Sequence, residues 1–257
     1  MSKIDNLIEI CFNAGKEILD IYNQTKISIE YKSDKSPLTL ADKKSHEHIC
    51  KSLKKLSPNI PILSEEGSHT SYKERKKWSS FWLIDPIDGT KEFIKKNGEF
   101  SVNIALIDKN KPILGIVYAP VINKYWYGTK EGSFVISNGK KRMIKVNERH
   151  NNQIKVVASR SHASPLIKNF LQSIGDYKLV SMGSSIKICL VAEGKADIYP
   201  RLAPTMEWDT AAAHAVLKYS GGSLIDLNTK KEMTYNRENL KNSHFIANSK
   251  MDVTSII

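Results

Sequence analysis

Acidic residues that follow apolar segments constrain the fold of this chain more than any other feature of its sequence. The segments 60–64 and 81–84 have the composition of buried strands, and each leads directly into carboxylates; Trp208 leads into a further one. These acids are Glu65, Glu66, Asp85, Asp88 and Asp209. A carboxylate at the end of a buried strand needs a cation beside it, because an uncompensated charge in apolar surroundings is costly. The fold must therefore gather these strand ends around positive charge.

The stretch "DPIDGT" at residues 85–90 has two interpretations. In the first it is a plain turn, in which Pro86 fixes φ, Asp88 caps a following helix and Gly89 relieves backbone strain. In the second its acids bind Mg²⁺, which prefers oxygen ligands and is typically held by a few carboxylates together with substrate phosphate oxygens. A helix that starts near Thr90 would add free N–H groups and a positive dipole end, which favour an anion. The number of acids favours the second interpretation, because carboxylates that converge without cations repel one another.

The pattern of the chain changes near residue 150, which predicts two subdomains, 1–150 and 151–257. The first half begins with an amphipathic helix over residues 4–22 and a second helix over 39–56. Its later strands, expected at 100–107, 113–118, 125–128 and 134–136, form an antiparallel meander. The second half alternates strands, at 155–158, 177–181, 196–199, 223–226 and 244–247, with helices from 164, at 184–193 and at 208–219. We therefore expect an α/β protein with an α+β N-terminal half and an α/β C-terminal half.

The charge of the chain limits its partners. A formal net charge of +12 raises nucleic acid as a partner, since clustered lysine and arginine bind phosphate backbones. The lysines are scattered, however, and the short clusters at 73–77 and 140–142 lack interleaved aromatic residues, so we interpret them as solvated faces and loops. We expect no nucleic acid partner. A basic surface instead steers small polyanionic substrates toward the protein.

Cysteine content and hydropathy bear on the compartment. Cys11, Cys50 and Cys189 are widely spaced and form neither a disulfide framework nor a zinc site, which predicts a reducing, cytoplasmic compartment. No apolar run approaches the roughly 18 residues that a spanning helix requires, so we expect no integral membrane segment. The N-terminal helix leaves peripheral association with the cytoplasmic membrane face open, although its apolar stripe is most simply core. We expect a monomer or a homodimer.

Three motifs, in order along the chain, resemble the signature of the lithium-sensitive, magnesium-dependent phosphatases that include the inositol monophosphatases. That signature is an acid pair after a strand, then DPxDGT, then a distant WDxAA; here it is matched by "SEE" at 64–66, "DPIDGT" at 85–90 and "WDTAA" at 208–212. Within the family the chain is most similar to the 3′(2′),5′-bisphosphate nucleotidases, through "DPIDGTKEFIKKNGEFSVNIALID", "KPILGIVYAPV", "SRSH" and "GSSIKICLVAEGKADIYPR". The resemblance spans residues 8–235. It implies a layered sugar-phosphatase fold and hydrolysis of the 3′-phosphate of adenosine 3′,5′-bisphosphate, a by-product of sulfate assimilation, to give AMP.

The resemblance also implies a set of metal ligands. One Mg²⁺ ion would be held by Glu65, Asp85 and the main-chain carbonyl of Ile87. A second would be held by Asp85, Asp88 and Asp209, and a weaker third would lie near Glu65. Lithium is expected to inhibit by replacing Mg²⁺ in the second of these sites.

Asp42 and Thr90 match the pair that polarises the attacking water in this family, with Asp42 accepting the Thr90 hydroxyl. Asp42 has an alternative interpretation, because Thr39 and Asp42 have the spacing of a capping box and the acid then only completes a helix start. Glu66 is ambiguous, since only the first acid of the pair at 65–66 matches a ligand, and we place it behind the metal site. Trp208 is interpreted as a packing anchor.

A larger set of residues matches the substrate contacts of the nucleotidases. These residues are Glu65, Ile87, Asp88, Gly89, Thr90, Ser159, His162, Gly183, Ser184, Lys187 and Asp209. Taken singly, Lys187 is typical of a helix surface, His162 of a loop and Ser184 of a helix cap. Their joint match favours one nucleotide pocket.

Two other functions stay open at this point. The first is an inositol or sugar phosphatase of the same family, which is disfavoured because those enzymes usually lack the continuation "KEF" at 91–93 and the "SRSH" segment. The second is a basic nucleic-acid-binding protein whose acids are structural. The chain departs from the nucleotidase pattern at Ala203 and Ala213, where glycine is usual. The pattern therefore does not predict the path of the loop before Trp208 or one contact of the helix that follows.

Overall fold

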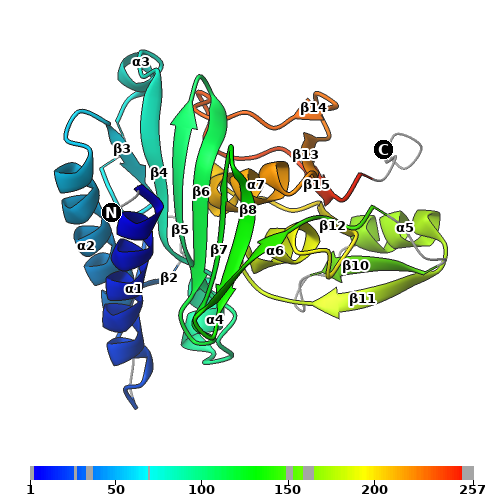
Figure 1. Cartoon of the computed structure of the whole chain (residues 1–257), viewed down its shortest axis with the longest axis horizontal. Helices are drawn as coiled ribbons and strands as arrows, with labels where there is room; N and C mark the ends of the chain where they lie inside the picture. The colour runs from blue at the N-terminus through cyan, green and yellow to red at the C-terminus, as the bar shows by residue number, and fades with distance from the viewer. Residues whose placement is uncertain are drawn as a thin grey trace.

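The computed structural model describes residues 3–25, 28–32, 37–68, 70–148, 153–158 and 165–250. Helices and sheets alternate in layers across the molecule (Figure 1). Helices α1 (Lys3–Tyr22) and α2 (Leu40–Leu56) cover the outer face of a seven-stranded sheet. Helices α6 (Ile186–Ala192) and α7 (Glu207–Tyr219) lie between that sheet and a six-stranded one, whose far face is covered by α5 (Pro165–Ile174). This layered architecture confirms the expected α/β class.

The seven-stranded sheet has the order β3-β4-β5-β6-β7-β8-β9. Its strands are β3 (Ile62–Ser64), β4 (Ser80–Asp88), β5 (Ser101–Asp108), β6 (Lys111–Ala119), β7 (Lys124–Thr129), β8 (Gly132–Ser137) and β9 (Lys140–Ile144). Strands β3 and β4 are parallel and all later neighbours are antiparallel, which confirms the expected meander. The cluster at 140–142 is solvent-exposed, as expected, but it lies in strand β9 and not in a loop. An edge strand pairs through its main chain with one neighbour only, so exposed charged side chains are compatible with it and protect the edge.

The six-stranded sheet has the order β11-β10-β12-β15-β13-β14 and is mixed. Its strands are β10 (Ile154–Ala158), β11 (Tyr177–Ser181), β12 (Ile198–Arg201), β13 (Ser223–Asp226), β14 (Lys231–Glu232) and β15 (Phe245–Asn248). Strands β10, β11 and β12, which α5 and α6 connect, are parallel, whereas β15 is antiparallel to both its neighbours. Outside the two large sheets, β1 (Ile29–Tyr31) pairs with β2 (Pro37–Thr39), and α3 (Tyr72–Arg75) precedes β4.

Strand β4 is buried on both faces, which explains its sequence. Trp82 and Ile84 belong to the core under α1 and α2, whereas Phe81 and Leu83 belong to the core shared with α6 and α7. A strand with two apolar faces has a continuous hydrophobic run instead of an alternating pattern. The strand therefore carries its carboxylates into the middle of the molecule.

Helix α7 lies directly on β6 and β7. A Cβ atom at Gly115 would fall 2.2 Å from the carbonyl oxygen of Ala212, and one at Gly128 would fall 2.5 Å from that of Ala215. Small residues on both sides thus permit backbone contact between helix and sheet. Ala213, where glycine was the expected pattern, is fully buried within this helix. The contact fixes the first turn of α7 relative to the sheet.

Among the residues that the structure describes, no helix has the combined length and apolar character that crossing a membrane demands. The thiols of Cys11, Cys50 and Cys189 are all free; Cys11 and Cys189 are buried and Cys50 is partly buried.

Candidate active site

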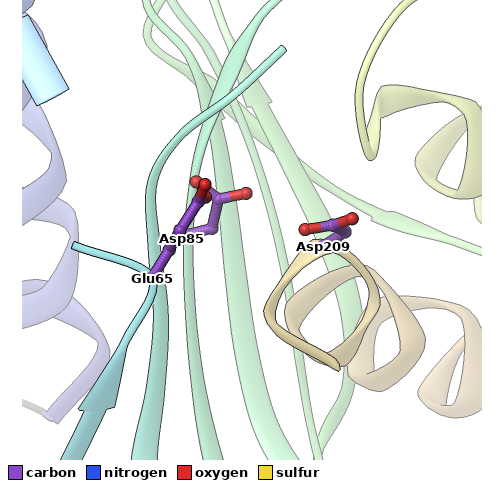
Figure 2. A group of neighbouring side chains, drawn as sticks. All are labelled: Glu65, Asp85 and Asp209. Carbon is purple, nitrogen blue, oxygen red and sulfur yellow. The ribbon is translucent and has the colours of Figure 1, made fainter. Parts of the chain in front are cut away.

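Three carboxylates from different elements meet in the middle of the molecule (Figure 2). Glu65 directly follows β3, Asp85 lies in β4, and Asp209 lies in the first turn of α7. One oxygen of each carboxylate lies within 4.8 Å of the others. Figure 2 shows Glu65 and Asp85 side by side at the edge of the sheet, with Asp209 across from them at the end of its helix. The structure thus brings together acids that lie far apart in the sequence.

The end of β4 is held in an irregular conformation. Its pairing with β5 shifts register between Asp85 and Asp88, around Pro86, which has no N–H to donate. The carbonyl oxygen of Pro86 accepts the Ser45 hydroxyl at 3.0 Å, and the main-chain N–H of Ile87 donates to Asp85 Oδ1 at 3.0 Å. The prediction that the strand ends at residue 84 is wrong, because pairing with β5 continues to Asp88. Both acids therefore belong to the strand, and the helix that follows has Gly89, with a φ of +94°, at its N-cap position. The structure thus confirms the plain-turn interpretation for Gly89 but not the capping role of Asp88.

Burial and, after it, mutual repulsion set the electrostatics of the acidic cluster. Asp85 is 1% exposed, and burial, together with the charges of Glu65, Asp88 and Asp209, raises its pKa well above that of an ordinary carboxyl group. Burial, followed by the charges of Asp88 and Glu65, raises the pKa of Asp209 in the same way. A divalent cation among these oxygens would offset the repulsion, and an all-oxygen ligand set suits Mg²⁺. The residues fit a magnesium site.

Asp42, in the first turn of α2, reaches toward Thr90, the first residue of α4 (Thr90–Ile94). The Thr90 hydroxyl lies 3.4 Å from Asp42 Oδ1 and 3.3 Å from the carbonyl oxygen of Ile87. The other oxygen of Asp42 accepts the main-chain N–H of Thr39 at 2.7 Å and its hydroxyl at 2.5 Å. Burial raises the pKa of Asp42, against the effect of these two donors. Helix capping and contact with Thr90 are compatible, because each uses a different oxygen.

Lys32 is a site residue that the sequence reasoning missed. It follows β1, and its Nζ lies 2.8 Å from Glu65 Oε1 and 2.5 Å from Glu66 Oε1. Burial raises the pKa of Glu66 to about 7, with the hydrogen bond from Lys32 opposing the rise. No sequence signal distinguishes this lysine, because it is one of 39 lysines and arginines and its partners lie on a distant segment.

A cavity of about 370 Å³ adjoins the acidic cluster. Among the predicted substrate contacts, those that line it are Asp88, Gly89, Gly183, Ser184, Lys187 and Asp209. Asp88 Oδ2 accepts a hydrogen bond from the main-chain N–H of Ser185, just before α6. Lys187 is buried, and burial lowers its pKa to about 8, although the charge of Asp88 favours the protonated form. The cavity therefore combines an acidic wall with a cationic one.

Arg201 shares the cavity with Lys187, a role that the sequence reasoning did not assign. Its Nη2 donates to the carbonyl oxygen of Pro204 at 3.1 Å, while its buried Nε has no hydrogen-bond partner among the described residues. The available signal was the stretch "YPR" at 199–201, a cation at the end of a buried strand and shortly before the acid-bearing helix. Of the other predicted substrate contacts, Glu65, Ile87 and Thr90 are not among the residues that line the cavity, and Ser159 and His162 lie outside the described residues.

The chain resembles known proteins along nearly its whole length. The model of the inositol monophosphatase family matches residues 1–255. The chain is 44% identical over 243 residues to the 3′(2′),5′-bisphosphate nucleotidase CysQ of Escherichia coli K12. The aligned region covers 94% of this chain and 98% of that protein. It is 36% identical over 247 residues to the protein of the same name from Haemophilus influenzae, and this alignment covers 95% of this chain and 91% of that protein.

Solved structures agree with the layered fold. The crystal structure of CysQ from Bacteroides thetaiotaomicron matches with a TM-score of 0.86 at 39% identity, over 97% of this chain and 98% of that one. An IMPase from Thermotoga maritima matches with a TM-score of 0.80 at 24% identity, over 100% and 95%. The second likeness concerns the fold alone. The expected sugar-phosphatase layering is confirmed.

Proposed function

The chain belongs to the inositol monophosphatase family, and we propose that it is a 3′(2′),5′-bisphosphate nucleotidase, which removes the 3′-phosphate of adenosine 3′,5′-bisphosphate to give AMP. The observation that carries the proposal is 44% identity, over nearly the whole chain, to a protein of that name. Identity to the Thermotoga maritima IMPase is 24%. The alternative of an inositol or sugar phosphatase is therefore not favoured.

The acidic cluster is assigned to Mg²⁺, as two or three ions. Glu65, Asp85 and the carbonyl oxygen of Ile87 would hold one ion, and Asp85, Asp88 and Asp209 another. Bound there, Mg²⁺ supplies activation of water and neutralisation of phosphate charge. The proximity of the three clustered carboxylates and their shared repulsion support this assignment.

Thr90 and Asp42 are assigned to orienting the attacking water. The Thr90 hydroxyl is 3.4 Å from Asp42 Oδ1, so donation toward Asp42 leaves its lone pairs free to accept an O–H of the water. Asp42 cannot turn away, because Thr39 holds its other oxygen by two hydrogen bonds. A positioned group of this kind accelerates hydrolysis by about 10² to 10⁴.

The cavity beside the cluster suits the remainder of a bisphosphate nucleotide. Lys187 and Arg201 place two cations where a phosphate that is not hydrolysed would need them. The rings of Tyr199 and Phe245 also line the cavity and offer apolar surface to a nucleoside. An inositol monophosphate has no second phosphate with which to use this wall.

Phosphate release from adenosine 3′,5′-bisphosphate, inositol 1-phosphate and fructose 1,6-bisphosphate tests the proposal, each with Mg²⁺ and with EDTA. We expect the highest kcat/KM for the nucleotide and no turnover in EDTA. Higher kcat/KM for inositol 1-phosphate would instead place the chain with the inositol phosphatases. Turnover of none of the three would contradict a phosphatase of this specificity.

A further inference from the structure

Helix α6, which forms one wall of the substrate cavity, is tied to the seven-stranded sheet at both ends. At its start, Ser185 donates its main-chain N–H to Asp88 on β4 and its hydroxyl to Asn103 on β5, the latter at 2.8 Å. At its end, Glu193 occupies the C-cap position. The first attachment belongs to the site already described. The second lies outside it.

Glu193 is a buried carboxylate with four donors around it. Its side chain is 1% exposed. One oxygen accepts Lys124 Nζ at 2.8 Å and Trp126 Nε1 at 3.1 Å; the other accepts a hydrogen bond from Arg142 and pairs with Lys195 Nζ at 3.0 Å. Burial favours the neutral form of Glu193, but these donors outweigh it, so the pKa lies below its ordinary value. The carboxylate is therefore charged and its two oxygens are both bonded.

Most of these donors come from the opposite side of the interface. Lys124 and Trp126 lie on β7 and Arg142 lies on β9, so three donors bind the end of α6 to the seven-stranded sheet. The next residue, Gly194, has a φ of +70°, and a Cβ there would fall 2.9 Å from the Asn147 side chain. The turn after α6 thus fits closely against the segment that follows β9. This fit is independent evidence that the end of α6 is fixed.

We propose that Glu193 is a positioning residue for the nucleotide: by fixing the end of α6, it holds Lys187 where the lysine meets the phosphate that is not hydrolysed. This inference rests on the proposed function. The two residues are six positions apart, about 9 Å along a helix, and a helix of seven residues tilts as one body. A small phosphate monoester that does not reach Lys187 does not depend on this position.

Glu193→Gln tests the role, because it keeps the shape of the side chain and removes the charge that the donors face. Trp126→Phe removes a single donor, and Arg142→Gln removes another whose side chain is largely exposed. The matched control is Glu148→Gln, which breaks an exposed ion pair with Lys250 at 2.8 Å. For each variant we would measure KM and kcat for adenosine 3′,5′-bisphosphate and for 4-nitrophenyl phosphate, AMP affinity by calorimetry, and Tm.

In Glu193→Gln we expect KM for the nucleotide and the Kd for AMP to rise about tenfold, equivalent to about 1.4 kcal/mol, with kcat within about twofold. Trp126→Phe and Arg142→Gln should show a smaller rise of about threefold. For 4-nitrophenyl phosphate, KM and kcat of every variant should match those of the wild type. Glu148→Gln should match the wild type on both substrates.

Unchanged KM in folded Glu193→Gln, or equal losses on both substrates, would overturn the inference. If Glu193→Gln does not fold, Trp126→Phe and Arg142→Gln decide, and unchanged KM in both overturns it. Absence of nucleotide turnover by the wild-type protein would instead overturn the proposed function, and this inference with it. If the wild type hydrolyses the nucleotide and the variants have unchanged KM, only the inferred role of Glu193 is wrong.

Discussion

At the scale of single residues, Asp42 divides its two oxygens between Thr39 and Thr90. Removing the Thr90 hydroxyl should therefore leave the metal ligands in place and disturb only the orientation of the water. We expect Thr90→Ala to lower kcat by about 10² to 10⁴ with little change in the Mg²⁺ concentration required, and Thr90→Ser to retain most activity. Mg²⁺ titrations of kcat measure both quantities. Loss of Mg²⁺ affinity with unchanged saturating kcat would show that the roles are assigned wrongly.

Lys187 allows a second test at this scale, because its buried ammonium lines the cavity beside Asp88. Lys187→Ala should remove a charge-assisted hydrogen bond, on the order of 1.5 to 3 kcal/mol, and lower kcat/KM for adenosine 3′,5′-bisphosphate by about 10- to 150-fold. Slow hydrolysis of inositol 1-phosphate should barely change. Lys178→Ala, on the exposed face of β11, is the control. Equal losses on both substrates would indicate that Lys187 supports the fold or the metals.

At the scale of elements, the contact between α7 and the sheet leaves no space for a methyl group at Gly115. Gly115→Ala should lower the free energy of unfolding by about 1 to 3 kcal/mol, because the helix carrying Asp209 must move away from β6. Urea denaturation measures the change. Gly67→Ala is the control, since its added atom would meet its nearest neighbour at 3.4 Å. Equal stability of the two variants would contradict the close packing.

The opposite side of α7 carries a buried histidine that should make stability depend on pH. His214 Nδ1 lies 2.9 Å from the Tyr235 hydroxyl and Nε2 lies 3.2 Å from Glu232, with Lys218 also nearby. Burial lowers the pKa of His214, and Glu232 opposes this effect. With a lowered pKa, the unfolded chain takes up a proton that the folded chain does not, so the stability contribution is complete above pH of about 6.5 and shrinks as pH falls.

The test compares the free energy of unfolding of the wild type and of His214→Gln by urea denaturation between pH 7.5 and 5.5. The wild type should lose more stability than the variant over this range, because only the wild type has the imidazole that must charge on unfolding. Parallel pH profiles would refute the assignment of a neutral, buried His214.

At the scale of the whole molecule, the acidic cluster joins the sheet side of the site, through Glu65 and Asp85, to α7, through Asp209. A cation between them should stabilise the folded protein, by about 2.7 kcal/mol at a concentration 100 times Kd. Mg²⁺ should therefore raise Tm relative to EDTA. Asp85→Asn should abolish the rise of Tm in Mg²⁺ and nearly abolish turnover. Asp20→Asn, on the exposed surface of α1, should retain the rise of Tm and the turnover. An equal Mg²⁺ effect in Asp85→Asn would exclude Asp85 as a ligand.

The sequence by itself determined the fold class, most element positions and the identity of the clustered acids. The reason is that these properties depend on local patterns. The two-faced apolar run of β4 marks a buried strand, helical spacing marks α1, and several acids that follow buried apolar runs indicate a site for a cation. The match of "DPIDGT" and "WDTAA" to a known family then linked the acids to one chemistry.

Only the tertiary structure decided which residues share space. Lys32 reaches Glu65 from another segment, Arg201 joins Lys187 in one cavity, and Glu193 finds its donors on β7 and β9. The strand end at Asp88 and the edge strand β9 also depend on partners elsewhere in the chain. Apart from the stretch "YPR" that ends in Arg201, none of these features has a local signal, because hydrogen bonding between strands and pairing of distant charges depend on the packing of the whole chain. That packing also sets the distances among Glu65, Asp85 and Asp209.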